Sequence, residues 1–442
     1  MSTNNSQLLI YTSLITSRIS YIFHFIFDEI LGIEYTIVTN IDSFKQSNDP
    51  KIAYAVENTW THSAFFEAHP LLHEMMIKNQ EMDISEYQNY KIFFKTSEKS
   101  ILPFDLFAAS FYLVARYEEY LPYHADQFNR FPASESLAYK NQFLEEPIIN
   151  QWCMILKNRL ITMFPTLDFK TRSFKFISTI DIDNAYAHLH KGIVRTFLSG
   201  TQLLVKQPSK LLQKINVLRR KIQDPYDNYE YLFKTHQTKN IETIYFILFS
   251  KYGKYDKNLN PKNKTFKSLV KKISSLYPVG LHPSYASNKN FEILKNEKEA
   301  LESLMGKQIT KSRQHFLKMK LPNTYENLAA LGIEEDYSMG YPEKPGFRAG
   351  TCSPFNFFNL KTNQAGKLKI FPFAIMDVTF KDYLGSSTSS TLIKIKKIIS
   401  SIQKVDGLFI SLWHNESLNP SNDQFSWRYV YERMLDRTKN GS

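Results

Sequence analysis

The chain has 442 residues, of which 43% are hydrophobic and 14% aromatic, and its formal net charge is +12. This length exceeds one ordinary hydrophobic core, so two domains are expected, and the aromatic content excludes a largely disordered chain. The two cysteines form neither a disulfide framework nor a metal-type spacing. No basic stretch precedes an apolar core at the N-terminus, and no apolar run approaches the roughly 20 residues of a membrane span. We therefore expect a cytoplasmic protein.

Residues 1–170 are predicted to form an N-terminal α/β or α+β domain, to which the sequence assigns no chemistry. Short runs of strand formers and longer stretches of helical periodicity share this region. The expected strands are 8–11, 34–39 and 51–55, and the expected helices are 17–31, 102–120 and 147–163. His62, His69 and His73 lie close together, but Pro70 would interrupt a helix that aligned them. We interpret these histidines as surface or core residues.

Residues 171–442 show a different pattern, in which expected strands alternate with expected helices. The strands are 174–181, 242–250, 278–282, 309–315, 369–376 and 407–413, and the helices are 229–239, 289–306, 324–331 and 391–405. Such alternation is typical of parallel βαβ units and predicts an α/β domain, either an open sheet or a closed barrel. In a barrel of this kind the active site lies at the carboxyl ends of the strands.

A basic helical insertion is expected near residues 188–222. Between Asn184 and Gln223 there are eight basic residues and no acidic one, and leucines and isoleucines recur among them at helical spacing. One interpretation is a solvated helix packed on the domain. The other is a surface for an anionic partner, either a membrane or a lipid- or nucleotide-linked sugar. Nucleic acid is not expected as a partner, because no known binding motif accompanies the charge.

Polar side chains gather where four of the expected strands end. They are Asp181 and Asp183 after the first strand, His282 after the third, Arg313 and His315 after the fourth, and His414 after the last. Aspartate and histidine are ligands suited to Zn²⁺ and similar divalent metals. A metal with a separate Asp and His can hydrolyse an amide. Each motif alone fits a structural role equally well, so the hypothesis depends on their shared position at strand ends.

The order of these segments resembles the polysaccharide deacetylase (NodB-homology) family over about residues 174–420. Thr179-Ile-Asp181-Ile-Asp183 is similar to an Asp-x-Asp variant of the family's first motif, and Phe409-Ile-Ser-Leu-Trp-His414-Asn resembles its last. Gly280-Leu-His282-Pro-Ser-Tyr-Ala286 matches only the first of two expected histidines. Ser312-Arg313-Gln-His315 has a histidine where the family has a proline.

The resemblance implies a distorted (β/α) barrel that uses a divalent metal, with zinc as the candidate, to remove acetyl groups from N-acetylated sugars. It implies that Asp181 is the general base, that His414 is the general acid and that Arg313 orients the base. Asp183 and His282 would bind the metal. Because position 286 is Ala, one expected ligand is missing. His315 is our candidate to replace it, with Asp256 as the alternative.

Outside these motifs, Phe347 and Arg348 in the loop 346–353 are expected to line the substrate cleft, with Arg348 available to an anionic group on the glycan or its carrier. An ordinary surface loop is the alternative interpretation. The segments Arg116-Tyr-Glu-Glu-Tyr120 and Gly280-Leu-His-Pro-Ser-Tyr285 also resemble a bacterial subgroup of the family with an added N-terminal domain of unknown role.

Two other functions stay open at this point. One is a different metal-dependent hydrolase of C–N or ester bonds on the same barrel. The other is a carbohydrate-binding protein that has lost catalysis, which the alanine at position 286 favours.

Overall fold

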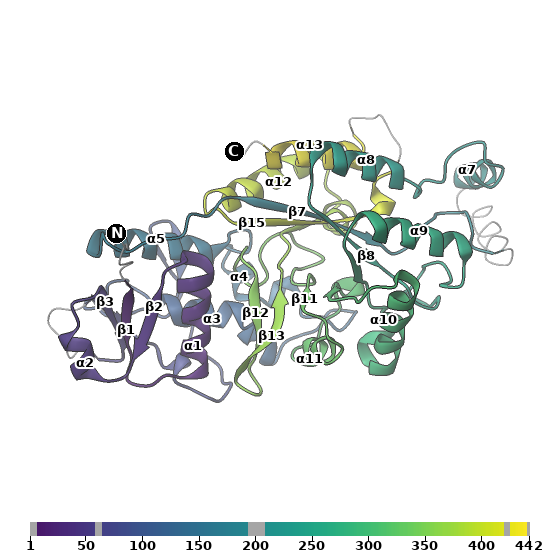
Figure 1. Cartoon of the computed structure of the whole chain (residues 1–442). Helices are drawn as coiled ribbons and strands as arrows, with labels where there is room; N and C mark the ends of the chain where they lie inside the picture. The colour runs from purple at the N-terminus through teal and green to yellow at the C-terminus, as the bar shows by residue number, and fades with distance from the viewer. Residues whose placement is uncertain (1–6, 58–63, 193–207, 420–424, 440–442) are drawn as a thin grey trace, which may run out of the picture.

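The computed structural model describes residues 7–57, 64–192, 208–419 and 425–439. Three sheets organise these residues: a four-stranded one near the N-terminus, a two-stranded hairpin after it, and a nine-stranded one in the rest of the chain (Figure 1). Apolar side chains of both parts pack into one continuous core, in which Tyr21 contacts Phe358 and Phe25 contacts Phe355. The N-terminal region (residues 1–170) therefore packs directly against the C-terminal region (residues 171–442).

The N-terminal region contains a four-stranded parallel sheet in the order β2-β1-β3-β4. Its strands are β1 (Leu8–Tyr11), β2 (Tyr35–Val38), β3 (Lys51–Ala55) and β4 (Ala64–Glu67), and a hairpin follows from β5 (Ser85–Tyr87) and β6 (Tyr90–Ile92). The helices are α1 (Ser17–Phe23), its π-helical continuation η1 (His24–Leu31), α2 (Ile41–Gln46), α3 (Leu106–Val114), α4 (Leu137–Lys140) and α5 (Ile148–Met163), with short 3₁₀ turns at Pro70–Leu72, Tyr117–Tyr120 and Ala133–Glu135. Helix α3 is buried along its whole length, as expected of a helix that is apolar on all sides.

The C-terminal region is built on a nine-stranded sheet in the order β12-β13-β11-β10-β9-β8-β7-β15-β14. The strands are β7 (Lys175–Ile182), β8 (Thr243–Ile247), β9 (Val279–Leu281), β10 (Lys311–Ser312), β11 (Glu335–Asp336), β12 (Phe355–Asn359), β13 (Gln364–Ile370), β14 (Ile375–Met376) and β15 (Leu408–His414). All neighbours are parallel except β12 and β13. The carboxyl ends of the parallel strands consequently meet along one edge.

Helices cover this sheet and connect its strands. They are α7 (Pro208–Leu218), α8 (Tyr229–Lys239), α9 (Lys264–Leu276), α10 (Phe291–Met305), α11 (Asn323–Ala330), α12 (Thr388–Gln403) and α13 (Trp427–Lys439), with short 3₁₀ or π turns at Ser287–Lys289, His315–Leu317, Thr379–Tyr383 and Asn415–Ser417. Helices α8, α12 and α13 lie together beside β7 and β15 (Figure 1). No helix in the described part of the chain is long and apolar enough to cross a membrane.

The mixed α/β architecture with parallel strands is confirmed, whereas a closed barrel is not found among the described strands, because β12 and β14 end the sheet. The expected strand 309–315 is only two residues long, and the expected strand 369–376 is split between β13 and β14. Helix α7 lies within the expected basic insertion 188–222, but residues 193–207 of that insertion lie outside the described residues. The division of the chain near residue 170 stays a prediction.

Candidate metal centre and active site

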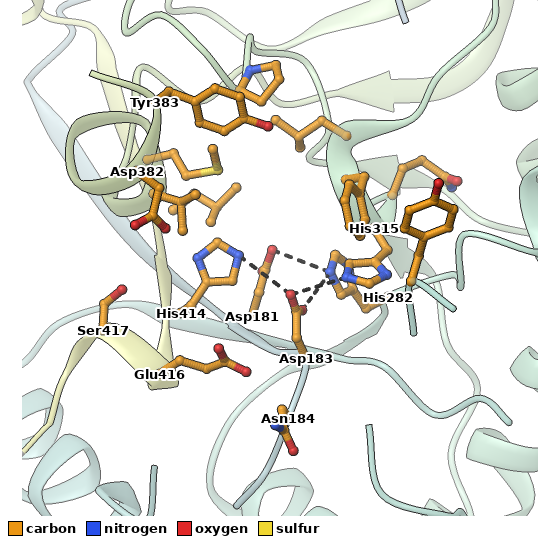
Figure 2. Close-up of a pocket in the computed structure, with 18 of the residues that line it drawn as sticks. Asp181, Asp183, Asn184, His282, His315, Asp382, Tyr383, His414, Glu416 and Ser417 are labelled. Atoms are coloured by element: carbon orange, nitrogen blue, oxygen red, sulfur yellow. Dashed lines mark ion pairs between the residues drawn. The ribbon is translucent and has the colours of Figure 1, made fainter. Parts of the chain in front are cut away.

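Three side chains from three neighbouring parts of the sheet face one another at its carboxyl edge. Asp183 follows β7, His282 follows β9 and His315 follows β10 (Figure 2). One ligand atom from each lies within 4.8 Å of the other two. Asp183 Oδ1 is 3.0 Å from His282 Nε2, and Asp183 Oδ2 is 3.3 Å from His315 Nε2. The side chain at position 286 is alanine, and His315 occupies the third place in this group.

The second nitrogen of each imidazole is held by another part of the protein. His282 Nδ1 hydrogen-bonds the carbonyl oxygen of Arg313 at 2.5 Å, and His315 Nδ1 hydrogen-bonds Asp256 Oδ1 at 2.8 Å. A neutral imidazole that donates through Nδ1 carries its lone pair on Nε2. In the neutral form, either ring held in this way would present its Nε2 lone pair beside Asp183, as metal-binding histidines with outer hydrogen-bond partners do. Asp256, the alternative third ligand, instead orients His315.

The spacing of these atoms fits a single small divalent cation. Ligands at about 2.0–2.1 Å from a tetrahedral zinc lie about 3.3 Å from one another, and the two carboxylate–imidazole distances are 3.0 and 3.3 Å. In addition, Asp183 Oδ1 is buried and has no partner of hydrogen-bond geometry in the described part of the chain, despite its closeness to His282. A buried carboxylate oxygen without a donor is costly, and a cation would satisfy it.

The pKa values of this group reflect its concentrated charge. Burial alone would raise the pKa of Asp183, but His315 and His282 outweigh it and hold that pKa well below the usual range. Burial would lower the pKa of His315, but Asp183 and Asp256 raise it to about 9. The carboxylate is therefore ionised at neutral pH, and a dication would take the place of the positive charge that His315 otherwise supplies.

Asp181 and Arg313 form a buried ion pair beside the three metal-facing side chains. Arg313 Nη1 donates to Asp181 Oδ1 at 3.0 Å and to Thr179 Oγ1 at 2.6 Å, and its Nε donates to the carbonyl of Tyr337. The guanidinium also lies 4.6 Å from the Phe246 ring centroid. The other carboxylate oxygen of Asp181 is 3.7 Å from His282 Nε2. Arg313 thus fixes one oxygen of Asp181 and leaves the other directed toward the cavity.

His414 lies on the opposite side of Asp183 and is oriented by Asp377. His414 Nδ1 is 2.7 Å from Asp377 Oδ1, and the His414 backbone N–H donates to Asp377 Oδ2 at 2.9 Å. Burial would lower the pKa of His414, but Asp377, Asp183 and Asp181 raise it to about 10. This imidazole therefore holds a proton at neutral pH, with Nε2 directed into the cavity, 3.8 Å from Asp183 Oδ2.

The pairing of the first and last strands explains how Asp181 and His414 come together. Strands β7 and β15 are adjacent and parallel, and Asp181 is the register partner of His414. Barrel closure is not needed for this approach. Asp377 was not predicted from the sequence, although it directly follows the expected strand 369–376 and so meets the same strand-end criterion as the other site residues.

These side chains line a cavity of about 400 Å³, a volume within the range of small-molecule sites. Its lining includes the charged groups Asp181, Asp183, His282, His315, His414, Glu416, Lys257, Lys381, Asp382 and Arg130, and the aromatic rings of Tyr255, Phe316 and Tyr383. In Figure 2, Tyr383 and Asn184 lie at opposite ends of this cavity, with the metal-facing side chains between them. The cavity therefore combines a candidate ion-binding centre with polar and aromatic walls.

Phe347 and Arg348 were expected to line the substrate cleft, and the structure corrects this prediction. Both are almost completely buried and neither lines the cavity. Arg348 donates to both oxygens of Glu119, at 2.9 and 2.7 Å, and to the carbonyl of Gly340. The guanidinium of Arg348 therefore binds groups at the contact between the N- and C-terminal regions, where no substrate group can reach it.

The comparisons with known proteins are limited in extent. Residues 8–165 match the model of a family of unknown function (DUF7033). A search of curated proteins finds no match. Among solved structures, a candidate polysaccharide deacetylase from Mycobacterium smegmatis is 12% identical, with a TM-score of 0.42, and the likeness covers 61% of this chain and 85% of that one.

Two further solved structures are similar at the same level. A polysaccharide deacetylase from Bacillus cereus is 13% identical with a TM-score of 0.30, covering 61% of this chain and 88% of that one. An allantoinase is 11% identical with a TM-score of 0.39, covering 60% and 84%. Because these TM-scores are low, the function proposed next rests on the side chains of the site.

Proposed function

We propose that the protein is a metal-dependent hydrolase that removes acetyl groups from N-acetylated sugars. One observation carries this proposal: a single cavity contains three ligand atoms for a divalent ion, a carboxylate aimed by an arginine and an imidazole aimed by a carboxylate. Amide hydrolysis needs these components together, namely an electrophilic centre, a base for water and an acid for the departing nitrogen.

Asp183, His282 and His315 would hold the ion, with zinc as the candidate. When bound, a divalent ion supplies Lewis acidity toward a carbonyl oxygen and toward water. The backbone carbonyl of Arg313 and the carboxylate of Asp256 would keep the two imidazoles turned toward the ion through hydrogen bonds to their Nδ1 atoms. Asp183 contributes the negative charge that a dication requires.

Asp181 is our candidate for the general base. It would take a proton from water as the water oxygen attacks the acetamide carbon. Arg313 occupies one carboxylate oxygen, so the proton goes to the other, which is directed toward the cavity. The ion pair keeps the carboxylate oriented for this transfer. Proton transfer by a positioned acid or base typically raises the reaction rate by a factor on the order of 10²–10⁴.

His414 is our candidate for the general acid. Its Nε2 proton would pass to the amide nitrogen as the carbon–nitrogen bond breaks, because an unprotonated amine leaves less readily than water and the intermediate would revert. Asp377 stabilises the imidazolium before the transfer and keeps Nε2 facing the cavity. The two catalytic groups thus begin in opposite protonation states, as an acid–base pair requires.

The test is metal analysis combined with an acetate-release screen over N-acetylated monosaccharides, oligosaccharides, and nucleotide- and lipid-linked sugars. We expect about one divalent ion per chain, acetate from at least one substrate, and loss of both in His315→Ala. Release of another product would assign a different metal-dependent hydrolysis to the same cavity. A chain that binds no divalent ion in any purification would overturn the proposal.

We also propose an anionic partner, in addition to the sugar substrate, for the basic insertion. The charge of residues 188–222 would suit an anionic membrane surface or the phosphate of a sugar carrier, and a solvated helix is the alternative. Flotation with anionic and neutral liposomes distinguishes this from a solvated helix: equal binding to both, or none to either, rejects the membrane interpretation.

A further inference from the structure

One residue of the N-terminal region lines the candidate active site. Arg130 is almost fully buried, yet it forms part of the cavity wall. Its Nη1 donates to the carbonyl oxygen of Phe316 at 2.6 Å, and its Nη2 lies 3.4 Å from the hydroxyl of Tyr383. Phe316 directly follows His315, whereas Tyr383 ends the π-helical turn beyond β14. The guanidinium therefore connects two walls of the cavity that come from different parts of the sheet.

The loop that presents Arg130 is held in shape by its own contacts. Asp126 accepts hydrogen bonds from the backbone N–H groups of Phe128 and Arg130 through Oδ1, and from Arg130 Nε through Oδ2 at 2.7 Å. The ring of Phe128 packs on Phe316 and Tyr255, with centroids 5.2 and 6.0 Å apart. Residues 126–130 (the wall loop) thus present both a fixed cation and an aromatic ring to the C-terminal region.

The turn that Arg130 contacts has an unfavourable backbone conformation. Phe316 and Leu317 both have positive φ angles, 61° and 51°, in the left-handed region that residues with side chains rarely adopt. Such a conformation persists only when surrounding contacts hold it in place. The Arg130 hydrogen bond and the Phe128 ring are contacts of this kind, and the first residue of this turn is the candidate metal ligand His315.

We propose that the wall loop of the N-terminal region is a functional part of the active site and makes it selective for short or chain-end substrates. Arg130 is a positioning residue that keeps His315 in place by holding the Phe316 turn. Its bridge to Tyr383 also lies at the Tyr383 end of the cavity, opposite Asn184 and Glu416 (Figure 2). A long polymer must leave a cleft at both ends, so a bridge across one end would favour a terminal sugar. The substrate part of this inference rests on the proposed function.

The positioning role is tested by metal affinity. Arg130→Ala should weaken Co²⁺ or Zn²⁺ binding about tenfold, in the range seen when outer-shell partners of a metal site are removed. Arg130→Lys retains one donor for the Phe316 carbonyl and should recover most of that affinity. Arg159→Ala is the matched control, because Arg159 is an exposed arginine of the same region that contacts Tyr87. Wild-type affinity in a folded Arg130→Ala variant would overturn the positioning role.

The substrate class is tested with N-acetylglucosamine and its tetramer, using mass spectrometry to locate each removed acetyl group. The wild-type chain should remove acetyl from a terminal unit of the tetramer only. Arg130→Ala should gain removal from internal units, and Arg159→Ala should not. If the wild type removed acetyl groups from internal units as fast as from terminal units, the proposed selectivity for chain ends would be overturned. If no N-acetylated sugar yields acetate, the proposed function fails, and the metal titration still decides whether Arg130 positions His315.

Discussion

Two clusters of buried charge in this protein have opposite organisations. In the interface cluster, both oxygens of Glu119 accept hydrogen bonds from Arg348, and one of them also from Arg116 at 2.8 Å. Glu118 binds Arg116 and the backbone N–H of Leu137. In the cavity cluster, Asp183 Oδ1 has no partner of hydrogen-bond geometry in the described chain. His282 Nε2 faces this oxygen, and His315 Nε2 faces Asp183 Oδ2.

This difference separates a structural cluster from one that binds a ligand. Where each charge finds its partner within the protein, nothing is left for a substrate, and the cluster holds two regions together. Where lone pairs converge and one acceptor has no donor, an external cation completes the arrangement. Burial and charge alone cannot distinguish the two cases, because both clusters contain fully buried arginines and carboxylates.

The largest expected effect is on turnover, in the cavity cluster. Asp181→Asn and His414→Ala each remove one of the two proposed proton-transfer groups, so we expect turnover to fall by on the order of 10²–10⁴. Neither residue belongs to the metal-facing triad, so metal content should stay near wild type. The measurement is acetate release together with metal analysis. Full activity in both variants on a verified substrate would exclude this mechanism.

The interface cluster should respond in stability instead. Glu119→Gln leaves the buried Arg348 without its carboxylate partner and Arg116 with Glu118 alone, and breaking a buried pair costs about 3–5 kcal/mol. Urea unfolding measures this loss. The metal affinity of the folded variant should be unchanged, because the side chains that bind Glu119 are Arg116 and Arg348, which do not line the cavity.

The matched control for this variant is Glu145→Gln, which removes a carboxylate from a partly exposed ion pair with Lys394. Its cost should be about 0–1 kcal/mol. If the two substitutions lowered the free energy of unfolding equally, the interface cluster would not be the main electrostatic contact between the two regions.

The sequence predicted local elements better than long-range pairing. Strands β1 and β3 and helix α8 have the predicted bounds, because their signals are contained within a few residues. Helix α9 was missed, although Phe266, Leu269, Val270 and Ile273 have helical spacing after the N-cap Asn263. The expected strand 309–315 stops at Ser312, because the Gln314 backbone N–H bonds to the side chain of Ser338 instead of to a neighbouring strand.

The strand-end criterion correctly predicted that most of the proposed site residues lie together. It could not predict which partners the arginines of loops would contact. The carboxyl ends of parallel strands meet at one edge, so local sequence predicts which polar residues lie there. The partner of Arg348 is 229 positions away, and no local pattern indicates it. Arg130 was missed for the same reason, since its contacts with Phe316 and Tyr383 depend on how the two regions pack.

A smaller effect is expected from the carboxylate that orients His315. Asp256→Asn keeps the shape of the side chain but weakens its hold on His315 Nδ1, so metal affinity should fall 10–100-fold, as is typical of outer-shell partners. Asp382→Asn is the control, because Asp382 is an exposed carboxylate that lines the same cavity. Zinc titration against a competing chelator measures both. Equal losses would mean that general negative charge, rather than orientation of His315, governs the affinity.

The smallest difference between the clusters should appear in the acid dependence of stability. Burial raises the pKa of Glu119, but Arg348 and Arg116 outweigh it and hold that pKa below its ordinary value of 4.5. The unfolded chain therefore binds a proton at Glu119 more readily than the folded chain does. The stability contributed by this carboxylate is present above pH 4.5 and is lost as the pH falls toward the folded pKa.

Glu119→Gln should accordingly lose stability less steeply than the wild type below about pH 4.5, by at most one proton or about 1.4 kcal/mol per pH unit. Urea midpoints measured at a series of pH values give both slopes. Glu145→Gln should keep a slope closer to the wild type, because its ion pair with Lys394 is partly solvated and screened. A Glu119→Gln slope equal to that of the wild type would mean that the two arginines do not hold Glu119 ionised more firmly in the folded chain. The contrast between an internally neutralised cluster and one that needs a cation would then rest on geometry alone.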